Sequence, residues 1–304
     1  MRTLRLLALV TAAFVYALIV LGAVVRITGS GMGCGDDWPL CNGRLIPSLH
    51  DLPTLVEWSH RLAAAGVSAL VVALAALAWA RRGELGVAGR GGALRPAQLA
   101  ALLLAVQVLL GAVTVWLELP AFVVTVHLAA ALGLLAAVMV VAIRASRPIG
   151  PPPSAMAARG TTAALVLAGI TLLLGGLTAS THAGFACQGF PLCSGRLWPS
   201  VESGLAEIQW VHRLAAYALL LHLVGLAVRF RKRGEGPMVQ RLAWIALAAA
   251  SVQVVVAAVM VLRFLPAEWR ALHAAFGSAV WVALVWLGGR VYPWAAGRVW
   301  PRDA

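Results

Sequence analysis

Eight long apolar segments recur along the chain and largely decide the environment in which it can fold. Each is close to the roughly 20 residues that a helix needs to cross the hydrocarbon layer of a bilayer. Of the 304 residues, 62% are hydrophobic and only 12% are charged, unlike ordinary soluble domains. The sequence therefore predicts an all-α integral membrane protein with eight transmembrane helices. They are expected over residues 4–25, 58–80, 97–117, 122–143, 161–179, 209–228, 240–262 and 270–290.

The net charge of +13 would suit nucleic-acid binding, but the distribution of the charges indicates membrane orientation instead. Most basic residues lie at the termini or between segments two and three, four and five, and six and seven, and most acidic residues lie in the other loops. We therefore expect a multi-pass protein of the cell membrane with both termini in the cytoplasm. Arg2 and Arg5 precede the first segment as in a signal peptide, but its length and the lack of a cleavage site favour a retained helix.

The chain is an internal duplication. Residues 38–48 (WPLCNGRLIPS) match residues 190–200 (FPLCSGRLWPS), and residues 57–64 (EWSHRLAA) match residues 209–216 (QWVHRLAA), both at an offset of 152. A repeat of this length is the mark of two similar structural units. Because each unit has an even number of helices, the two are expected to be parallel four-helix bundles related by an axis along the membrane normal.

The repeat also predicts the domain organisation. We expect an N-terminal four-helix half over residues 1–147 and a C-terminal four-helix half over residues 161–304. Residues 148–160 are predicted to be a cytoplasmic linker, because this stretch contains the proline-rich run from Pro148 to Pro153.

Four of the seven histidines are paired by the repeat: His60 with His212, and His127 with His273. All four lie in the first turns of helices that enter from the external side, so we expect their rings at one depth. Ionisable residues inside membrane helices are costly and are usually functional. One histidine from each of two helices could hold a haem iron from both faces. For any single histidine, the alternative is a hydrogen bond to a neighbouring helix.

Other metals fit this pattern less well, since zinc and copper sites usually add cysteine or carboxylate at short spacing. Arg61 and Arg213 directly follow two of the candidate ligands. They either contact haem propionates at the external surface or extend to the membrane interface. The remaining histidines have no repeat partner and are interpreted as incidental or as neighbours of the site: His50, His182 and His222.

The two halves differ beside the candidate ligands. Glu57 precedes His60 by three residues and shares its helix face, whereas the matching residue before His212 is Gln209. A carboxylate in one half and an amide in the other suggest one reactive site and one electron-transfer site. Glu57 could accept a proton or stabilise positive charge on a substrate carbon, or it could simply cap the start of its helix.

All four cysteines lie in two predicted external loops, as the pairs Cys34 with Cys41 and Cys187 with Cys193. The external side of the membrane is oxidising, so two local disulfides are expected. Such a bond could be purely structural, or the first pair could exchange electrons or thiols above a haem.

Together these residues resemble the haem A synthase family, which completes haem A in cytochrome oxidase assembly. The resemblance covers nearly the whole chain. It rests on the eight helices in two halves, the paired cysteines, the EWSHR motif and the GAVVRITGSGMGC stretch at residues 22–34.

The resemblance implies haem O as the substrate in the first half, between His60 and His127, and a haem b in the second, between His212 and His273. The C8 methyl group of haem O would be oxidised to a formyl group through an alcohol, giving haem A, with Glu57 as the catalytic carboxylate. The haem b would relay electrons to an acceptor in the membrane. Haem O would arrive from a haem O synthase partner, and the chain could form a homo-oligomer.

Three other functions compete with this interpretation. A non-catalytic di-haem b cytochrome, shuttling electrons between quinol and an external acceptor, could carry the same histidines but has no need for the difference between Glu57 and Gln209. A transporter would be expected to break helices at matched positions near the midplane. A thiol–disulfide oxidoreductase would need its cysteines and not its histidines.

Overall fold

The computed structural model describes residues 1–48, 50–89, 91–146, 154–199 and 204–292. Within these ranges the fold is all-α, and eight helices are long and apolar enough to cross a membrane, which confirms the predicted multi-pass membrane protein. A short 3₁₀ helix, η1, covers Ala183–Ala186. The eight are α1 (Arg2–Ile27), α2 (Leu52–Ala80), α3 (Leu94–Trp116), α4 (Ala121–Arg144), α5 (Ala155–Ser180), α6 (Leu205–Lys232), α7 (Pro237–Leu262) and α8 (Ala267–Val291).

Several helices extend beyond the apolar segments that predicted them, and for α2 and α5 a capping side chain decides where the helix begins. The Asp51 side chain accepts the backbone N–H of Thr54, so α2 begins six residues before the predicted position. Ser154 caps α5 in the same way by accepting from Ala157, and the buried Glu235 accepts from the backbone and hydroxyl of Ser154. The predicted linker at 148–160 is therefore helical from Ala155, and its proline run lies outside the described residues.

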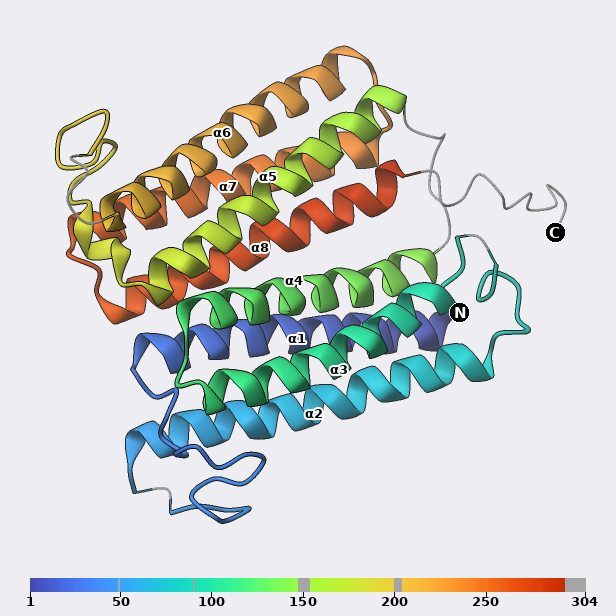
Figure 1. The fold of residues 1–304 in the computed structure, drawn as a ribbon. Helices are drawn as coiled ribbons and strands as arrows, with labels where there is room; N and C mark the ends of the chain where they lie inside the picture. Colours follow the sequence, from blue (N-terminus) through green and yellow to red (C-terminus); the bar gives the residue numbers. More distant parts are fainter. Residues whose placement is uncertain (49, 90, 147–153, 200–203, 293–304) are drawn as a thin grey trace, which may run out of the picture.

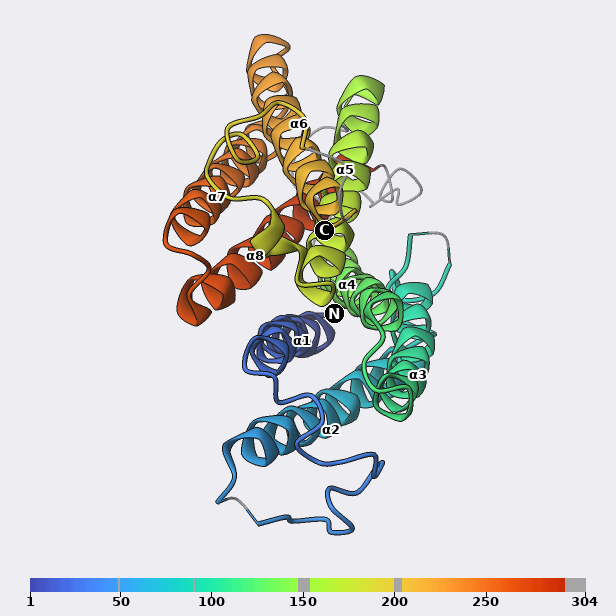
Figure 2. The ribbon, with the colours of Figure 1, turned by 60° about the vertical axis from the view of Figure 1, so that its left-hand side comes forward.

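In each set of four helices the first contacts the fourth, so that the set forms a closed bundle. The contacting pairs in the first set are α1–α2, α2–α3, α3–α4 and α1–α4, and the second set repeats them as α5–α6, α6–α7, α7–α8 and α5–α8. Figure 1 shows the two sets as layers, and Figure 2 shows the seam where α1 and α4 meet α5 and α8. This arrangement is the one expected for two four-helix bundles from a duplicated chain.

The two cysteine loops lie at one end of the molecule, which we call the cysteine-loop end. Cys34 is bonded to Cys41 and Cys187 to Cys193, confirming the predicted pairing. The loops are alike in detail, since each has a cis proline peptide (Trp38–Pro39 and Phe190–Pro191). Each also has a single bridge that links its second cysteine to an arginine three residues on.

The two large clusters of buried apolar residues lie away from the cysteine-loop end, where a small cluster forms around Cys187, Cys193 and Trp210. One hydrophobic cluster fills the first bundle and another the second. At an intermediate level the packing changes: the buried residues of α1 stop at Val15 and resume at Val25, and those of α5 stop at Ala168 and resume at Thr178. Buried layers on both sides therefore enclose a level that protein side chains pack less completely.

Side chains join the two bundles by hydrogen bonds to main-chain carbonyls. The Tyr16 hydroxyl of α1 donates to the carbonyl of Ala275 in α8, at 2.9 Å. The Trp281 indole of α8 donates to the carbonyl of Leu132 in α4, at 3.1 Å. These bonds fix how the two halves sit against each other along the seam.

We expect Tyr16→Phe to lower the free energy of unfolding by about 1 kcal/mol, because the ring stays while one interhelical hydrogen bond is lost. Thermal unfolding of the purified protein in detergent measures this change. Phe14→Leu, on an exposed position of the same helix, serves as the control. An unchanged melting temperature for Tyr16→Phe would mean that this bond does not help to hold the seam.

Candidate functional site

The four predicted histidines lie at the less completely packed level, two in each bundle. His60 and His127 are close enough to interact electrostatically, as are His212 and His273. All four rings sit deep among protein atoms but keep accessible surface. Beyond the histidines, toward the opposite end of the molecule, buried residues recur along the inner face of each helix, from Val67 on α2 and from Gly277 on α8. The histidines therefore lie at the level where the buried layers of α1 and α5 are interrupted.

The second pair has the spacing of two ligands on one metal ion. The ring centroids of His212 and His273 are 6.3 Å apart, and the ring planes are inclined at 82°. With each imidazole nitrogen about 2 Å from a shared metal ion, ring centroids on opposite sides lie about 6 Å apart. A haem iron needs only two axial ligands from protein, which fits a pair of histidines without further donors. The described residues contain no group of three or more potential metal ligands.

Two glycines allow the helices to approach the histidine rings. A Cβ atom on Gly22 of α1 would lie 3.1 Å from Cε1 of His60, and one on Gly175 of α5 would lie 2.9 Å from Cε1 of His212. Both distances are tighter than ordinary contacts, so any larger residue would push the ring. Gly22 belongs to the motif singled out in the sequence, but its contact with a histidine was not predicted. The signal was present in the matched spacing, since both glycines precede the first cysteine of their loop by 12 residues.

The hydrogen bonds of the rings differ between the two halves. Nδ1 of His212 lies 3.0 Å from the carbonyl oxygen of Thr171 in α5, so it carries the proton in this contact and leaves Nε2 free to bind a metal. Nδ1 of His60 and Nδ1 of His127 are buried and have no partner among the described residues. The second half thus orients the His212 ring by a hydrogen bond at Nδ1, which neither histidine ring of the first half has.

A glutamine accompanies the second histidine of each pair. The Gln253 amide lies 2.9 Å from Nδ1 of His273 and donates to the carbonyl of the same residue, also at 2.9 Å. The Gln107 amide lies 3.4 Å from Nε2 of His127. Both glutamines therefore hydrogen bond between helices, and the carbonyl oxygens of both amides are buried without a partner.

Glu57 connects the first cysteine loop to the helix that carries His60. One carboxylate oxygen, Oε2, accepts the backbone N–H of Cys34 at 2.8 Å. The other, Oε1, accepts Nη2 and Nε of Arg61 at 2.6 and 3.0 Å. Only 4% of Glu57 is exposed. It does not cap α2, because Asp51 does so. The carboxylate is instead an oriented, buried group on the face of α2 that carries His60.

The arginines that follow His60 and His212 hold the loops in the same way. Nη1 of Arg61 donates to the carbonyls of Asp37 and Leu40, at 2.7 and 2.6 Å. Nη1 of Arg213 donates to the two equivalent carbonyls, of Gly189 and Leu192, both at 2.8 Å.

In the second half the loop is bound by Arg213 and Tyr217 of α6, and the Tyr217 hydroxyl donates to the carbonyl of Pro191 at 2.7 Å. Nη2 of Arg213 donates to the carbonyl of Cys187 at 2.6 Å, while the amide oxygen of the neighbouring Gln209 is buried without a partner. Arg61 and Arg213 were predicted to contact propionates or the membrane interface. Most of their donors bind loop main chain or Glu57, and contact with propionates stays a prediction.

The other histidines lie apart from the two pairs. Nε2 of His222 lies 2.8 Å from the carbonyl of Gly160, near the opposite end of the bundle. His182 precedes η1 in a left-handed conformation. His50 lines an open hollow beside the first cysteine loop.

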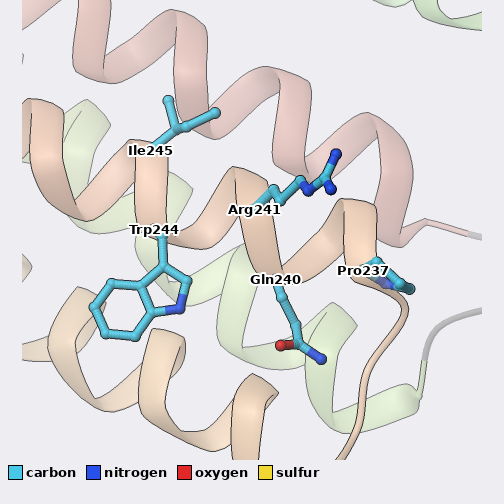
Figure 3. A pocket seen from close by; sticks show the side chains of 5 residues that line it. All are labelled: Pro237, Gln240, Arg241, Trp244 and Ile245. Atoms are coloured by element: carbon cyan, nitrogen blue, oxygen red, sulfur yellow. The ribbon is translucent and has the colours of Figure 1, made fainter.

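Another open hollow, drawn in Figure 3, is far from the chemistry. It occupies one face of α7, at the end opposite the cysteine loops, where it is lined by Pro237, Gln240, Arg241, Trp244 and Ile245. Their spacing of three and four residues means that a single helix supplies the whole lining. Neither hollow contains a candidate haem ligand.

Comparison with known proteins gives a consistent result. The profile of a family described as cytochrome oxidase assembly protein matches residues 5–285. The Heme A synthase of Bacillus cereus (strain G9842) is 32% identical over 310 aligned residues, which cover 95% of this chain and 94% of that protein. The Heme A synthase of Shouchella clausii is 31% identical, covering 74% of this chain and 75% of that protein. That of Alkalihalophilus pseudofirmus is 30% identical, covering 75% and 76%.

We expect Gly175→Ala to lower the amount of bound haem, because the added methyl group pushes the His212 ring from its position against α5. Gly22→Ala should act in the same way on His60. Haem per protein, measured from the absorbance of the purified protein, checks both. Gly66→Ala and Gly225→Ala, where a Cβ atom meets nothing within 4 Å, are the matched controls on α2 and α6. Equal haem in all four variants would contradict the contact.

We expect Arg213→Lys to loosen the second cysteine loop, because an ammonium group cannot reach three carbonyls with the geometry of a guanidinium. The bond between Cys187 and Cys193 should then be reduced roughly tenfold faster, given the strength of charge-assisted hydrogen bonds. Alkylation after mild reduction, read by mass spectrometry, measures the rate. Arg196→Lys, at an exposed loop position, is the control, and equal rates in both variants would refute the role of Arg213.

Proposed function

Because the chain belongs to the cytochrome oxidase assembly protein family, we propose that it is a haem A synthase. The substrate is haem O, whose C8 methyl group undergoes two successive two-electron oxidations, through an alcohol, to the formyl group of haem A. Water supplies the oxygen atom, and the electrons leave to an acceptor in the membrane. The observation that carries the proposal is the pair of histidine sites in which Glu57, three residues before His60, is matched by Gln209 before His212. A simple electron carrier has no use for a buried Glu57 beside His60 where the other half has Gln209.

We assign a different function to each half. The first half holds the substrate between His60 and His127, and the second half holds a resident haem b between His212 and His273. The hydrogen bond from His212 to Thr171 supports this division, since an oriented ligand suits a haem that stays. The unpartnered Nδ1 atoms of His60 and His127 suit a haem that enters and leaves. When bound, the haem b supplies one-electron transfer.

Glu57 acts on the substrate as an oriented anion. Its two oxygens are fixed by Cys34 and Arg61, so the carboxylate needs no rearrangement when positive charge develops on the methyl carbon next to the ring. Electrostatic stabilisation by groups already in place is often the largest contribution to catalysis. The buried position of Glu57 strengthens the effect, because water screens it little.

The proposal also includes orientation and partners. The basic loops and both termini face the cytoplasm, and the cysteine loops face the external side. Haem O reaches the first half from a haem O synthase in the same membrane, and the haem b passes electrons to a membrane acceptor. The disulfide between Cys34 and Cys41 holds the loop that fixes Glu57, which gives it a structural role whether or not it also exchanges electrons.

We expect Glu57→Gln to lower haem A formation by about 100-fold or more, because the shape of the side chain is kept while its charge is lost. The protein is expressed in cells that make haem O, and the haems are extracted and identified by chromatography. Wild type should yield haem A or its alcohol precursor, and the variant should keep haem O and haem b. Gln209→Ala, the change at the matching position, should leave haem A formation intact.

A wild-type protein that contains haem b alone, in cells with ample haem O, would contradict the proposal. The di-haem b cytochrome would then be the better account.

A further inference from the structure

The two matched arginines beside the histidines differ in whether a carboxylate neutralises them. Arg61 forms a salt bridge with Glu57, with 2.6 Å between Nη2 and Oε1. At the position that matches Glu57, Gln209 carries a neutral amide, and the three hydrogen bonds of Arg213 all go to main-chain carbonyls. The salt bridges among the described residues do not include Arg213. Its guanidinium group is therefore a positive charge without a counter-ion in the described part of the chain.

The unpaired charge of Arg213 is buried next to a candidate haem ligand. Only 6% of Arg213 is exposed, and it directly follows His212, so the two Cα atoms are about 3.8 Å apart. The loop carbonyls lower the cost of burying the guanidinium group, but they are dipoles and leave its net charge in place. Because water screens a buried charge little, its effect reaches the neighbouring groups. The second histidine site therefore lies beside one net positive charge, which Glu57 cancels at the first site.

The one acidic residue of α6, Glu207, does not neutralise Arg213. Both of its carboxylate oxygens are buried without a partner among the described residues. Glu207 precedes Arg213 by six residues, so it lies about 9 Å away along the helix axis and on a different face of the helix. The contrast between the paired Arg61 and the unpaired Arg213 therefore remains when this carboxylate is considered.

The other charged residues around the two sites differ in the same direction. In the first half, the segments at the cysteine-loop end, residues 26–61 and 115–127, contain five acidic and three basic residues. The matching segments of the second half, residues 179–213 and 261–273, contain three acidic and four basic residues. Salt screens exposed charges over about 10 Å, so these residues matter less than a buried group. They nevertheless add to the positive charge of the second site and not of the first.

We propose that the unpaired guanidinium group of Arg213 raises the reduction potential of the haem held by His212 and His273, and that the neutral side chain of Gln209 keeps it unpaired. The inference rests on the proposed function, since it takes a haem in the second half as given. Reduction of a ferric haem adds one electron, and a nearby positive charge stabilises the reduced form. Electron transfer is thereby favoured from the first half, which is oxidised, to the second, which is reduced. The acceptor in the membrane then removes the electron.

The test measures a reduction potential and not catalysis. The purified protein with haem b is titrated with reductant and followed by absorbance, in a His60→Ala background that removes a ligand only from the first half. We expect Arg213→Gln to lower the equilibrium constant for reduction roughly tenfold, or by about 59 mV for a one-electron couple. Arg213→Lys loosens the same loop but keeps the charge, so its potential should stay at the value of the background protein. An equal fall in both variants would assign the effect to the loop and overturn the proposal.

A second arm leaves the arginine in place. Gln209→Glu introduces a carboxylate four residues before Arg213, as Glu57 stands before Arg61, so the potential should fall. Gln209→Ala alters the packing without a charge, and its potential should not fall. The titration is repeated at several pH values, because a buried carboxyl group can keep its proton at neutral pH, and the fall should grow as the pH rises. A potential that Gln209→Glu leaves unchanged at every pH would overturn the role of Gln209.

A third arm separates the buried charge from exposed ones. Arg196→Gln removes an exposed positive charge from the same half, and it should change the potential less than Arg213→Gln does. An equal change in the two variants would overturn the proposal, as would an unchanged potential in Arg213→Gln. Each of these outcomes leaves haem b in the protein and the proposed function intact. A wild type without haem b would instead contradict the proposed function.

Discussion

The guanidinium groups of Arg61 and Arg213 tie the cysteine loops to the helices that carry His60 and His212. Each arginine directly follows its histidine, so the imidazole and the guanidinium leave the helix about 100° apart, one toward the bundle interior and one toward the loop. The loop carbonyls that accept these bonds have few other donors, since the described loops form only single bridges. In each half the arginine therefore fixes the cysteine loop to the helix that carries the candidate ligand, and the disulfide holds the loop closed.

Within this shared frame the two halves diverge in what they do with their polar groups. In the first, the backbone of Cys34 is bound by the Glu57 carboxylate, and the Nδ1 atoms of His60 and His127 have no partner among the described residues. In the second, Arg213 binds the loop directly and His212 is oriented by Thr171. The duplicated sequence thus gives two copies of one scaffold that differ in how a few polar side chains are used, which is the difference that the proposed division of function depends on.

The number of helices and the pairing of the histidines could be predicted from the sequence. Hydrophobic segments predicted the eight helices, and the offsets of 152 and 146 residues paired His60 with His212 and His127 with His273. Helix starts at Leu52 and Ala155 were missed, because caps such as Asp51 lie outside the apolar pattern.

Contacts between helices were harder to predict, since periodicity does not say what a side chain reaches. The contact of His212 with Gly175 and its hydrogen bond to Thr171 both depend on how α6 packs against α5. The role expected of Arg61 and Arg213 illustrates the same limit: their proximity to the ligands was visible, but not the loop carbonyls that occupy them.

The level between Val15 and Val25 on α1, and its equivalent on α5, has a consequence for the life of the protein in the cell. A chain whose interior is completed by a ligand gains stability from that ligand by mass action. Newly made protein without haem would open more often and be degraded sooner. The amount of this protein in the cell would then follow the supply of haem.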